Sequence, residues 1–213
     1  IKLLKNYKGI KYMARTTVYI TVTNEKIIRL QACAQGFRNS FFIIYNSMIS
    51  KEGCESWAQD GYGMSVLGTN GCFSLELYLK FLLVINSFNN STLLGEHMKG
   101  HSLDDLYDEL NRLNSTYTTD LENLYSKSKY KYSNKTLRDF LAGIKNYFID
   151  WRYSYDKGPL NVNLNTLTDV LNYMEDYSLK KYLPVSQILA QHQFSTSDDQ
   201  TMSINNFGDI KKL

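Results

Sequence analysis

The segment over residues 71–85 constrains the fold of this chain more than any other. It is apolar on almost every side of a helix, yet it carries Glu76 and Lys80 four residues apart. On a helix this spacing places both side chains on one face, with the carboxylate N-terminal to the ammonium, which is the favourable order. A helix that is hydrophobic all round is buried, and buried charges need partners. We therefore expect a buried helix with further polar side chains directed at this pair.

Composition favours an all-α fold. The 213 residues, 43% of them hydrophobic, are enough for one core in one domain. Only 2 prolines and 12 glycines interrupt the chain, which favours long helices over many short strands joined by turns. The three cysteines have no CxxC spacing, so we expect reduced thiols, no disulfide framework, no metal and no cofactor.

The net charge and the hydropathy pattern give little information about binding partners. A net charge of +3 neither indicates nor excludes nucleic-acid binding. The longest apolar stretch, near 77–85, is interrupted by Lys80 and is far shorter than the roughly 20 residues that span a bilayer. The N-terminus lacks the features of a signal peptide. We expect a soluble cytoplasmic protein with no membrane partner.

Hydrophobic spacing predicts an up-and-down helical bundle of five to six helices within residues 24–194. Residues 1–23 are expected to form an N-terminal arm, either extended or a strand, and residues 195–213 a flexible tail. The expected helices cover roughly 25–49, 64–87, 103–113, 119–128, 136–155 and 165–182.

Several local signals refine these helices. Gly68 to Gly71 are a weak point where the second helix could break. Ser102 with Asp105 approximates a capping box for the third helix. Leu183-Pro184 ends the last helix, because proline cannot continue a helix and disfavours helical geometry before it. The first helix is expected to bury Ile27, Ile28, Cys33, Ala34, Phe37, Phe41, Ile44 and Met48.

Four polar residues could meet between the helices: Glu76, Lys80, His101 and Arg152. Such a cluster is either a polar pocket with perturbed acid–base properties or a structural ion-pair network that fixes the helix register. His97 lies four residues before His101, but no further ligand is near, so the pair does not predict a metal site.

Two aromatic and basic segments are candidates for nucleic-acid contact. Arg152 is flanked by Trp151, Tyr153 and Tyr155, a combination that suits phosphate binding and base stacking, or else Arg152 pairs inward with an acid. The run 125–132 interleaves three lysines with tyrosines, as a single-strand binder would, or is a solvated loop.

Three segments together resemble the HEPN-domain family. They are Phe73–Leu83, which contains Glu-Leu-Tyr-Leu-Lys, then Lys99–Leu103 with Gly-His-Ser, and Phe148–Asp156 with Trp-Arg-Tyr. Their order and separation are similar to the HEPN pattern over roughly residues 25–182. The family consists of small helical bundles common in prokaryotic toxin–antitoxin and phage-defence systems. The resemblance implies a four- or five-helix bundle, often a homodimer with its functional groove at the dimer seam.

The resemblance also bears on catalysis. Many HEPN proteins are metal-independent ribonucleases that use an arginine followed, after four to six residues, by a histidine. Arg152 matches the arginine, but Lys157, Gly158 and Pro159 stand where the histidine is expected. Without that imidazole, no obvious group is left to move the proton of a ribose 2′-hydroxyl.

These observations lead to one expectation with two alternatives. We expect a non-catalytic or atypical HEPN-like protein that binds RNA, a nucleotide or a protein partner. Arg152, Tyr153 and Tyr155 would make the contacts, and Glu76, Lys80 and His101 would position Arg152 from behind. The first alternative is a metal-independent ribonuclease in which Arg152 steadies the phosphate and His101 acts as base and acid. The second is a structural protein that only dimerises.

Overall fold

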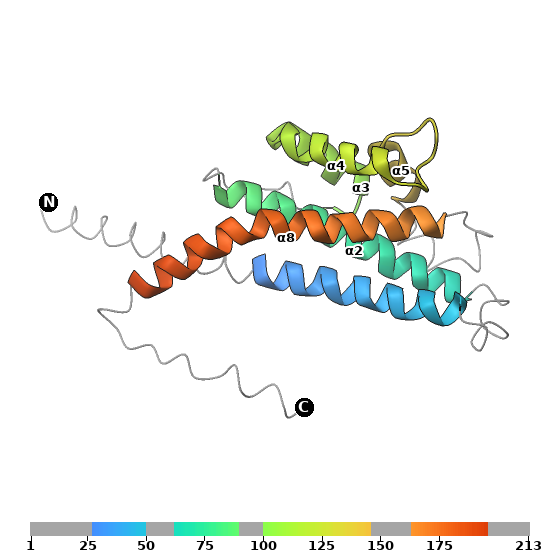
Figure 1. Ribbon diagram of the computed structural model, residues 1–213, viewed down its shortest axis with the longest axis horizontal. Helices are drawn as coiled ribbons and strands as arrows, with labels where there is room; N and C mark the ends of the chain where they lie inside the picture. The colour runs from blue at the N-terminus through green and yellow to red at the C-terminus, as the bar shows by residue number, and fades with distance from the viewer. Residues whose placement is uncertain (1–26, 50–61, 90–99, 146–162, 196–213) are drawn as a thin grey trace, which may run out of the picture.

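A computed structural model describes residues 27–49, 62–89, 100–145 and 163–195. Within these ranges the chain forms six helices and no strand, which confirms the predicted all-α bundle (Figure 1). The helices cover residues 27–49, α2 (Tyr62–Asn89), α3 (Leu103–Leu113), α4 (Ser115–Lys127), α5 (Leu137–Ile144) and α8 (Leu164–Ser195).

Helix 27–49, α2 and α8 are the long helices and lie side by side (Figure 1). Helix 27–49 is antiparallel to α2, because Ala34 accepts a hydrogen bond of 2.9 Å from the Ser74 hydroxyl while Phe41, further along the first helix, lies near Gly71. The ring of Phe37 meets that of Phe73 edge to face, with 4.4 Å between the centroids. An aromatic pair therefore contributes to the packing between these two helices.

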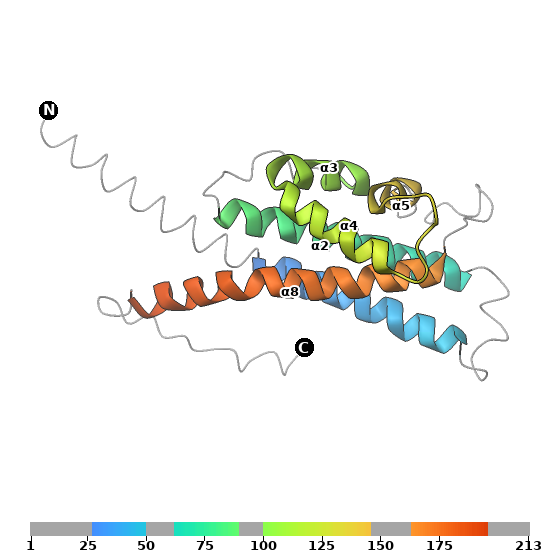
Figure 2. The same ribbon diagram turned by 45° about the horizontal axis from the view of Figure 1, so that its top comes forward.

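α2 and α8 run in the same direction. Gly71 lies against Leu167, and further along both helices the Phe81 ring lies 5.9 Å from that of Tyr182. Parallel neighbours need a long connection, and α3, α4 and α5 provide part of it. These short helices form a second layer over α2 and α8, with α4 between α3 and α8 (Figure 2).

Contacts within the second layer fix its orientation. Asp104 pairs with Lys145 and Asp108 with Arg138, so α3 and α5 are antiparallel. α4 is joined to α8 by Lys181, whose ammonium lies 4.8 Å from the ring centroid of Tyr117 and 4.9 Å from that of Tyr177.

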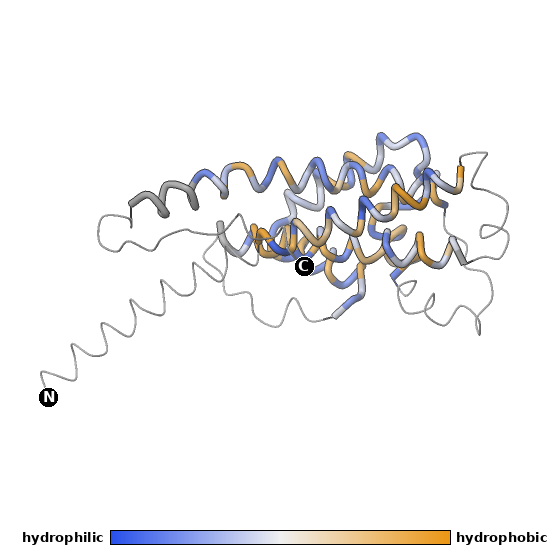
Figure 3. The backbone as a smooth tube through the Cα atoms, turned by 90° about the horizontal axis from the view of Figure 1, so that it is seen from below, coloured by the Kyte–Doolittle hydropathy of each residue, from blue (hydrophilic) through white to orange (hydrophobic). Residues whose placement is uncertain are grey.

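The core follows the expected segment of α2. Hydrophobic and hydrophilic stretches alternate along the helices (Figure 3), as amphipathic packing requires. α2 is the exception, since nearly every residue from Leu75 to Ser87 is buried. The prediction that this segment is buried is confirmed.

α2 does not break at its glycines. It continues through Gly68 and Gly71, and a Cβ atom at position 71 would lie only 2.8 Å from Cδ2 of Leu167 and 3.2 Å from Cδ2 of Phe41. The expected weak point is therefore where three helices approach one another closely, and the missing side chain at Gly71 permits that approach.

α8 does not end at Leu183-Pro184 as predicted but continues to Ser195 with Pro184 inside it. Proline removes the hydrogen bond to the carbonyl four residues earlier, and the C-terminal part of α8 is inclined to the rest (Figure 1). Val185, which is fully buried against Ile27, Phe81, Val84 and Ile85, compensates for this loss. Tertiary packing thus outweighs the local signal.

The structure corrects one predicted cap, at the start of α3, and one predicted helix start, that of α4. Ser102 is the N-cap of α3 but makes no side-chain cap bond, because its hydroxyl donates to the carboxylate of Asp104 instead of serving a box with Asp105. α4 begins at Ser115 rather than Thr119, directly after the chain turns at Asn114. By contrast, α5 starts as predicted after Thr136, which forms a complete capping box with Asp139.

Helix 27–49 buries most but not all of the expected stripe. Ile27, Ala34 and Phe41 are fully buried, and Phe37, Ile44 and Met48 pack partly against the core. Ile28 and Cys33 are exposed, contrary to prediction, because the buried stripe is narrower than the sequence pattern indicates. The predicted arm over 1–23 and the predicted tail, apart from Ser195, lie outside the described residues.

Candidate functional site

The candidate site is built around the carboxylate of Glu76 in the middle of α2. This side chain is 3% exposed, and its Oε1 lies 2.6 Å from Nζ of Lys80, one turn further along the helix. Because the surrounding positions of α2 are filled by buried leucines, the carboxylate is removed from bulk water. A charge in such surroundings persists only with close partners of opposite charge or good donors.

His101 provides a second partner. Its Nδ1 lies 2.9 Å from the same Oε1 of Glu76, although the two residues are 25 positions apart. Gly100, directly before it, has a φ of +109°, a backbone conformation that side chains rarely adopt. Glycine here lets the chain turn into α3 so that the imidazole faces α2. We call Glu76, Lys80 and His101 the Glu76 cluster.

The geometry assigns a tautomer to His101. A carboxylate only accepts hydrogen bonds, so Nδ1 donates to Glu76 and, in the neutral ring, Nε2 is the acceptor. The side chain of His101 is 59% exposed, whereas Lys80 is 12% exposed. The cluster therefore runs from a buried carboxylate to an imidazole at the surface, oriented by that carboxylate as in an acid–base pair.

A second ion pair lies beside His101 in the sequence. Oδ2 of Asp104 lies 2.8 Å from Nζ of Lys145, and Oδ1 accepts from the Ser102 hydroxyl. Burial alone would raise the pKa of Asp104, but these hydrogen bonds and the charge of Lys145 outweigh burial and hold the pKa below its usual value. The sequence analysis missed this pair, because a carboxylate and an ammonium 41 positions apart leave no local signal.

The structure brings together three of the four residues predicted to meet. Glu76, Lys80 and His101 form one cluster, as expected, which fits the structural interpretation of a register-fixing network as well as the interpretation as a polar site. Arg152, Tyr153 and Tyr155 lie outside the described residues. Lys145 is the last described residue before the segment that carries them.

The described residues offer little for other kinds of site. In the part of the chain that the structure describes, no three His, Cys, Asp or Glu side chains gather as a metal centre would need. None of the described helices combines the length and hydropathy of a membrane-spanning segment. Cys72 is buried against the Ile144 carbonyl, and burial raises the pKa of its thiol to about 12, so it is no ready nucleophile.

Comparison with models of protein families, with curated proteins and with solved structures finds no match to this chain. The HEPN resemblance stays a prediction from the sequence.

Proposed function

We propose that this protein is an atypical, HEPN-like helical bundle that binds RNA at the surface beside His101. The observation that carries the proposal is the Glu76 cluster, in which one buried carboxylate oxygen holds both an ammonium and an exposed imidazole. Keeping a carboxylate inside the core is costly, and a purely structural register could be fixed by apolar residues at lower cost. With Nδ1 held by Glu76, the exposed imidazole presents a flat ring and Nε2, which suit stacking on a base and a hydrogen bond from a ribose hydroxyl or base amine.

Chain connectivity supports the same surface. Lys145, whose ammonium pairs with Asp104 near the start of α3, leads into the segment that carries Arg152, Tyr153 and Tyr155. Guanidinium and tyrosine rings are the groups that bind phosphate and stack on unpaired bases. In this proposal Arg152 contacts a phosphate, and the Glu76 cluster supports the same site. A prokaryotic defence or stress system is the setting that the HEPN resemblance implies.

Binding is tested with a labelled single-stranded RNA of mixed sequence. We expect His101→Ala to weaken affinity by about 1 kcal/mol or more, and Arg152→Ala to weaken it while lowering the salt slope by about 0.7. Thr119→Ala, an exposed change on α4, serves as the control and should bind like the wild type. Unchanged affinity in both test variants would reject this site.

A second candidate function is metal-independent RNA cleavage, and the pairing of Glu76 with His101 favours it specifically. In such a reaction a base takes the proton of the ribose 2′-hydroxyl and the 2′-oxygen attacks phosphorus. The bond to the 5′-oxygen breaks, and the protonated base returns a proton to that oxygen. Nε2 of His101 is the atom suited to this transfer, with Nδ1 held by Glu76. Incubation with RNA in EDTA should then give 2′,3′-cyclic phosphate ends, and His101→Ala should abolish them. Cleavage that persists in that variant would exclude His101 as the base.

Other partners are distinguished by the same preparations. HEPN-like bundles are expected to form homodimers, which light scattering on the purified chain measures directly. A dimer that binds neither RNA nor nucleotides would support the purely structural alternative. A protein partner would then be the remaining ligand class from the sequence analysis.

A further inference from the structure

The last residue of α4 and the connection from it to α5 carry a dense group of exposed cations. Lys127, Lys129, Lys131 and Lys135 are all exposed, and residues 127–135 contain no acidic residue. None of the four ammonium groups pairs with a carboxylate of the described residues. Instead, the Lys131 ammonium donates to the Ser126 carbonyl at 2.7 Å. We call residues 127–135 the lysine–tyrosine loop.

This loop is held in one shape. The Ser128 hydroxyl donates to Asp169 of α8 at 2.6 Å, and the Thr166 hydroxyl, also on α8, donates to the carbonyl of Tyr130. At its other end the backbone N–H of Tyr132 donates to the Tyr125 hydroxyl. Hydrogen bonds to two helices therefore fix its backbone before any ligand arrives, which lowers the entropic cost of binding.

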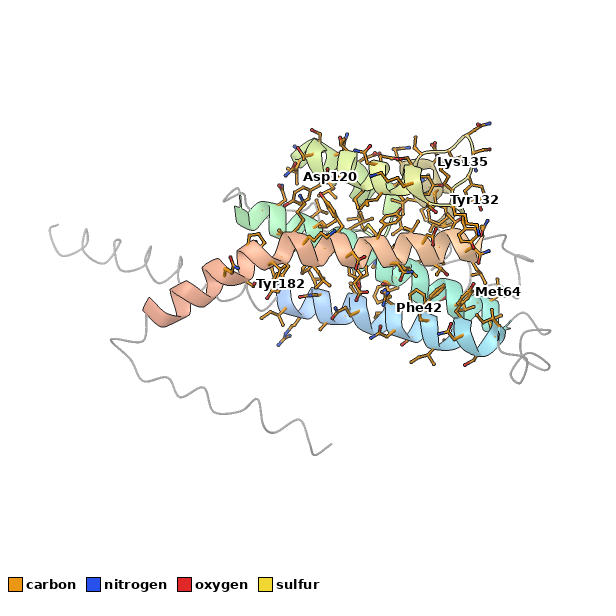
Figure 4. The ribbon with its side chains drawn as sticks, in the orientation of Figure 1. Phe42, Met64, Asp120, Tyr132, Lys135 and Tyr182 are labelled. Atoms are coloured by element: carbon orange, nitrogen blue, oxygen red, sulfur yellow. The ribbon has the colours of Figure 1, made fainter. Side chains whose placement is uncertain are left out.

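Aromatic rings alternate with the cations. The Lys129 ammonium lies 5.2 Å from the ring centroid of Tyr130, and the Lys135 ammonium lies 5.2 Å from that of Tyr132. Tyr130 is 38% exposed, whereas Tyr132 is partly buried and packs near Phe140. Tyr132 and Lys135 lie together at the end of the second layer where α5 begins (Figure 4). One ring is thus anchored and the other is open to a stacking partner.

The carboxylates of Asp169 and Asp139, which lie beside the loop, accept hydrogen bonds from neighbouring hydroxyl groups. Asp169 accepts from Ser128, and Asp139 accepts from Thr136 in the capping box of α5. Neither forms an ion pair with the four lysines in the part of the chain described. The positive charge of the loop is therefore directed to solvent, where it attracts a polyanion.

We propose that the lysine–tyrosine loop is a contact surface for single-stranded RNA, in which its lysines bind successive phosphates and Tyr130 stacks on an unpaired base. Single strands suit this surface because a base must be free of its pair to stack on a side chain, and stacking tolerates any sequence. The proposal rests on RNA being the ligand, as proposed above, and it adds a contact site on another part of the second layer.

The test measures binding of a labelled single-stranded RNA of about 12 nucleotides, within the range of known single-strand sites, between about 50 and 200 mM salt. Lys127→Gln with Lys129→Gln should weaken binding and lower the salt slope by about 0.7 for each phosphate that a lysine no longer neutralises. The matched control is Arg29→Gln with Lys180→Gln, which removes the same charge from exposed positions of helix 27–49 and α8. The control should keep the wild-type slope.

Stacking is tested separately at Tyr130. Tyr130→Ala should weaken binding roughly 5-fold or more, whereas Tyr130→Phe keeps the ring and should bind as the wild type does. Thermal unfolding of each variant shows that the loop changes leave the bundle folded.

Where the wild type binds RNA, the outcomes distinguish this inference from the proposed function. If the wild type binds RNA and His101→Ala weakens binding while all loop variants bind normally, the loop proposal is overturned and the proposed function stands. If the two double variants lower the slope equally, the effect is one of net charge and the loop site is rejected. A duplex of the same sequence bound as tightly as the single strand would overturn the stacking role. No binding by the wild type would reject both proposals.

Discussion

At the residue scale, the buried carboxylate of Glu76 is the feature on which the candidate site depends. Its two partners share one oxygen, and the two distances of 2.6 and 2.9 Å leave little room for rearrangement. One partner is local in sequence and the other arrives from the start of α3. Substitutions can measure how much this arrangement contributes to the free energy of unfolding. They can also measure how far the packing depends on Gly71, which lies against Leu167.

Removing one partner should cost more than removing both. Lys80→Met leaves the buried carboxylate short of a cation and is expected to lower the free energy of unfolding by about 3 kcal/mol or more. The double variant Glu76→Leu with Lys80→Met should recover most of that stability. Arg138→Gln, in a pair with Asp108 that is nearly half exposed, is the control and should destabilise far less than Lys80→Met, because solvent screens an exposed pair. Urea unfolding measures all three, and equal decreases in the single and double variants would contradict the role of burial.

Gly71 is expected to be intolerant of larger side chains. Gly71→Val places atoms where Leu167 and Phe41 already lie, and overpacking of this kind costs about 1–3 kcal/mol. Gly36→Ala is the matched change in a helix interior with nothing within 4 Å, and it should stabilise by about 0.5–1 kcal/mol. Thermal unfolding of both variants measures these two changes in stability. A stabilising Gly71→Val would show that the three helices do not approach as described.

At the element scale, packing carries α8 past Pro184. Pro184 should stop a helix, and the sequence offers no local reason for it to continue, yet Val185 is buried in the small cluster that joins α8 to α2 and helix 27–49. The same holds at the start of α4, where Asn114 breaks the helical backbone and its side chain donates to Asn86 of α2. Both boundaries depend on contacts with other helices.

Substitutions at the two neighbours of Pro184 test whether the burial of Val185 stabilises α8 beyond the proline. Val185→Ala removes buried methyl groups and should lower the free energy of unfolding by about 1–3 kcal/mol. Leu183→Ala, 60% exposed on the other side of the proline, should change it by less than about 0.5 kcal/mol. Urea unfolding compares the two. A larger effect at Leu183 would place the buried face of α8 elsewhere.

The sequence predicted what depends on periodicity and missed what depends on distant partners. The burial of α2 and the bounds of α3 follow from hydrophobic spacing, and α5 starts at Leu137, one residue from the predicted start at Thr136. The meeting of His101 with Glu76 was predicted because a buried charge requires partners. Asp104 with Lys145 could not be, since either residue looks like an ordinary surface charge. The continuation of α8 through Pro184 was missed because the tendency of proline to end a helix is outweighed here by the packing of Val185.

At the scale of the whole molecule, two layers are joined by a few polar contacts and a shared core. The long helices supply most of the buried apolar surface, and the short helices close over α2 with ion pairs at their edges. Stability of the whole should therefore respond to pH through the carboxylates at these edges, Asp104 above all because it is almost fully buried.

Acid should remove the contribution of Asp104. Its pKa is lower in the folded chain than in the unfolded one, so it stabilises the fold above about pH 4 and ceases to do so as pH falls through the folded value. Asp104→Asn should thus destabilise clearly at pH 7 and less at about pH 2.5. Asp105→Asn, on the exposed next residue, is the control. Denaturant titrations at both pH values measure the stability lost in Asp104→Asn relative to the wild type. A larger loss in acid than at pH 7 would contradict the lowered pKa of Asp104.

Glu122 joins three short helices through one side chain. From α4 it accepts hydrogen bonds from the Tyr107 hydroxyl of α3 at 2.9 Å and from the backbone N–H groups of Leu137 and Arg138 at the start of α5. The first amides of a helix normally exchange their hydrogens quickly with solvent, since no carbonyl precedes them. Here those of Leu137 and Arg138 are shielded only while α4 is in place. Exchange at the start of α5 therefore reports on the opening of α3, α4 and α5 as one cooperative unit.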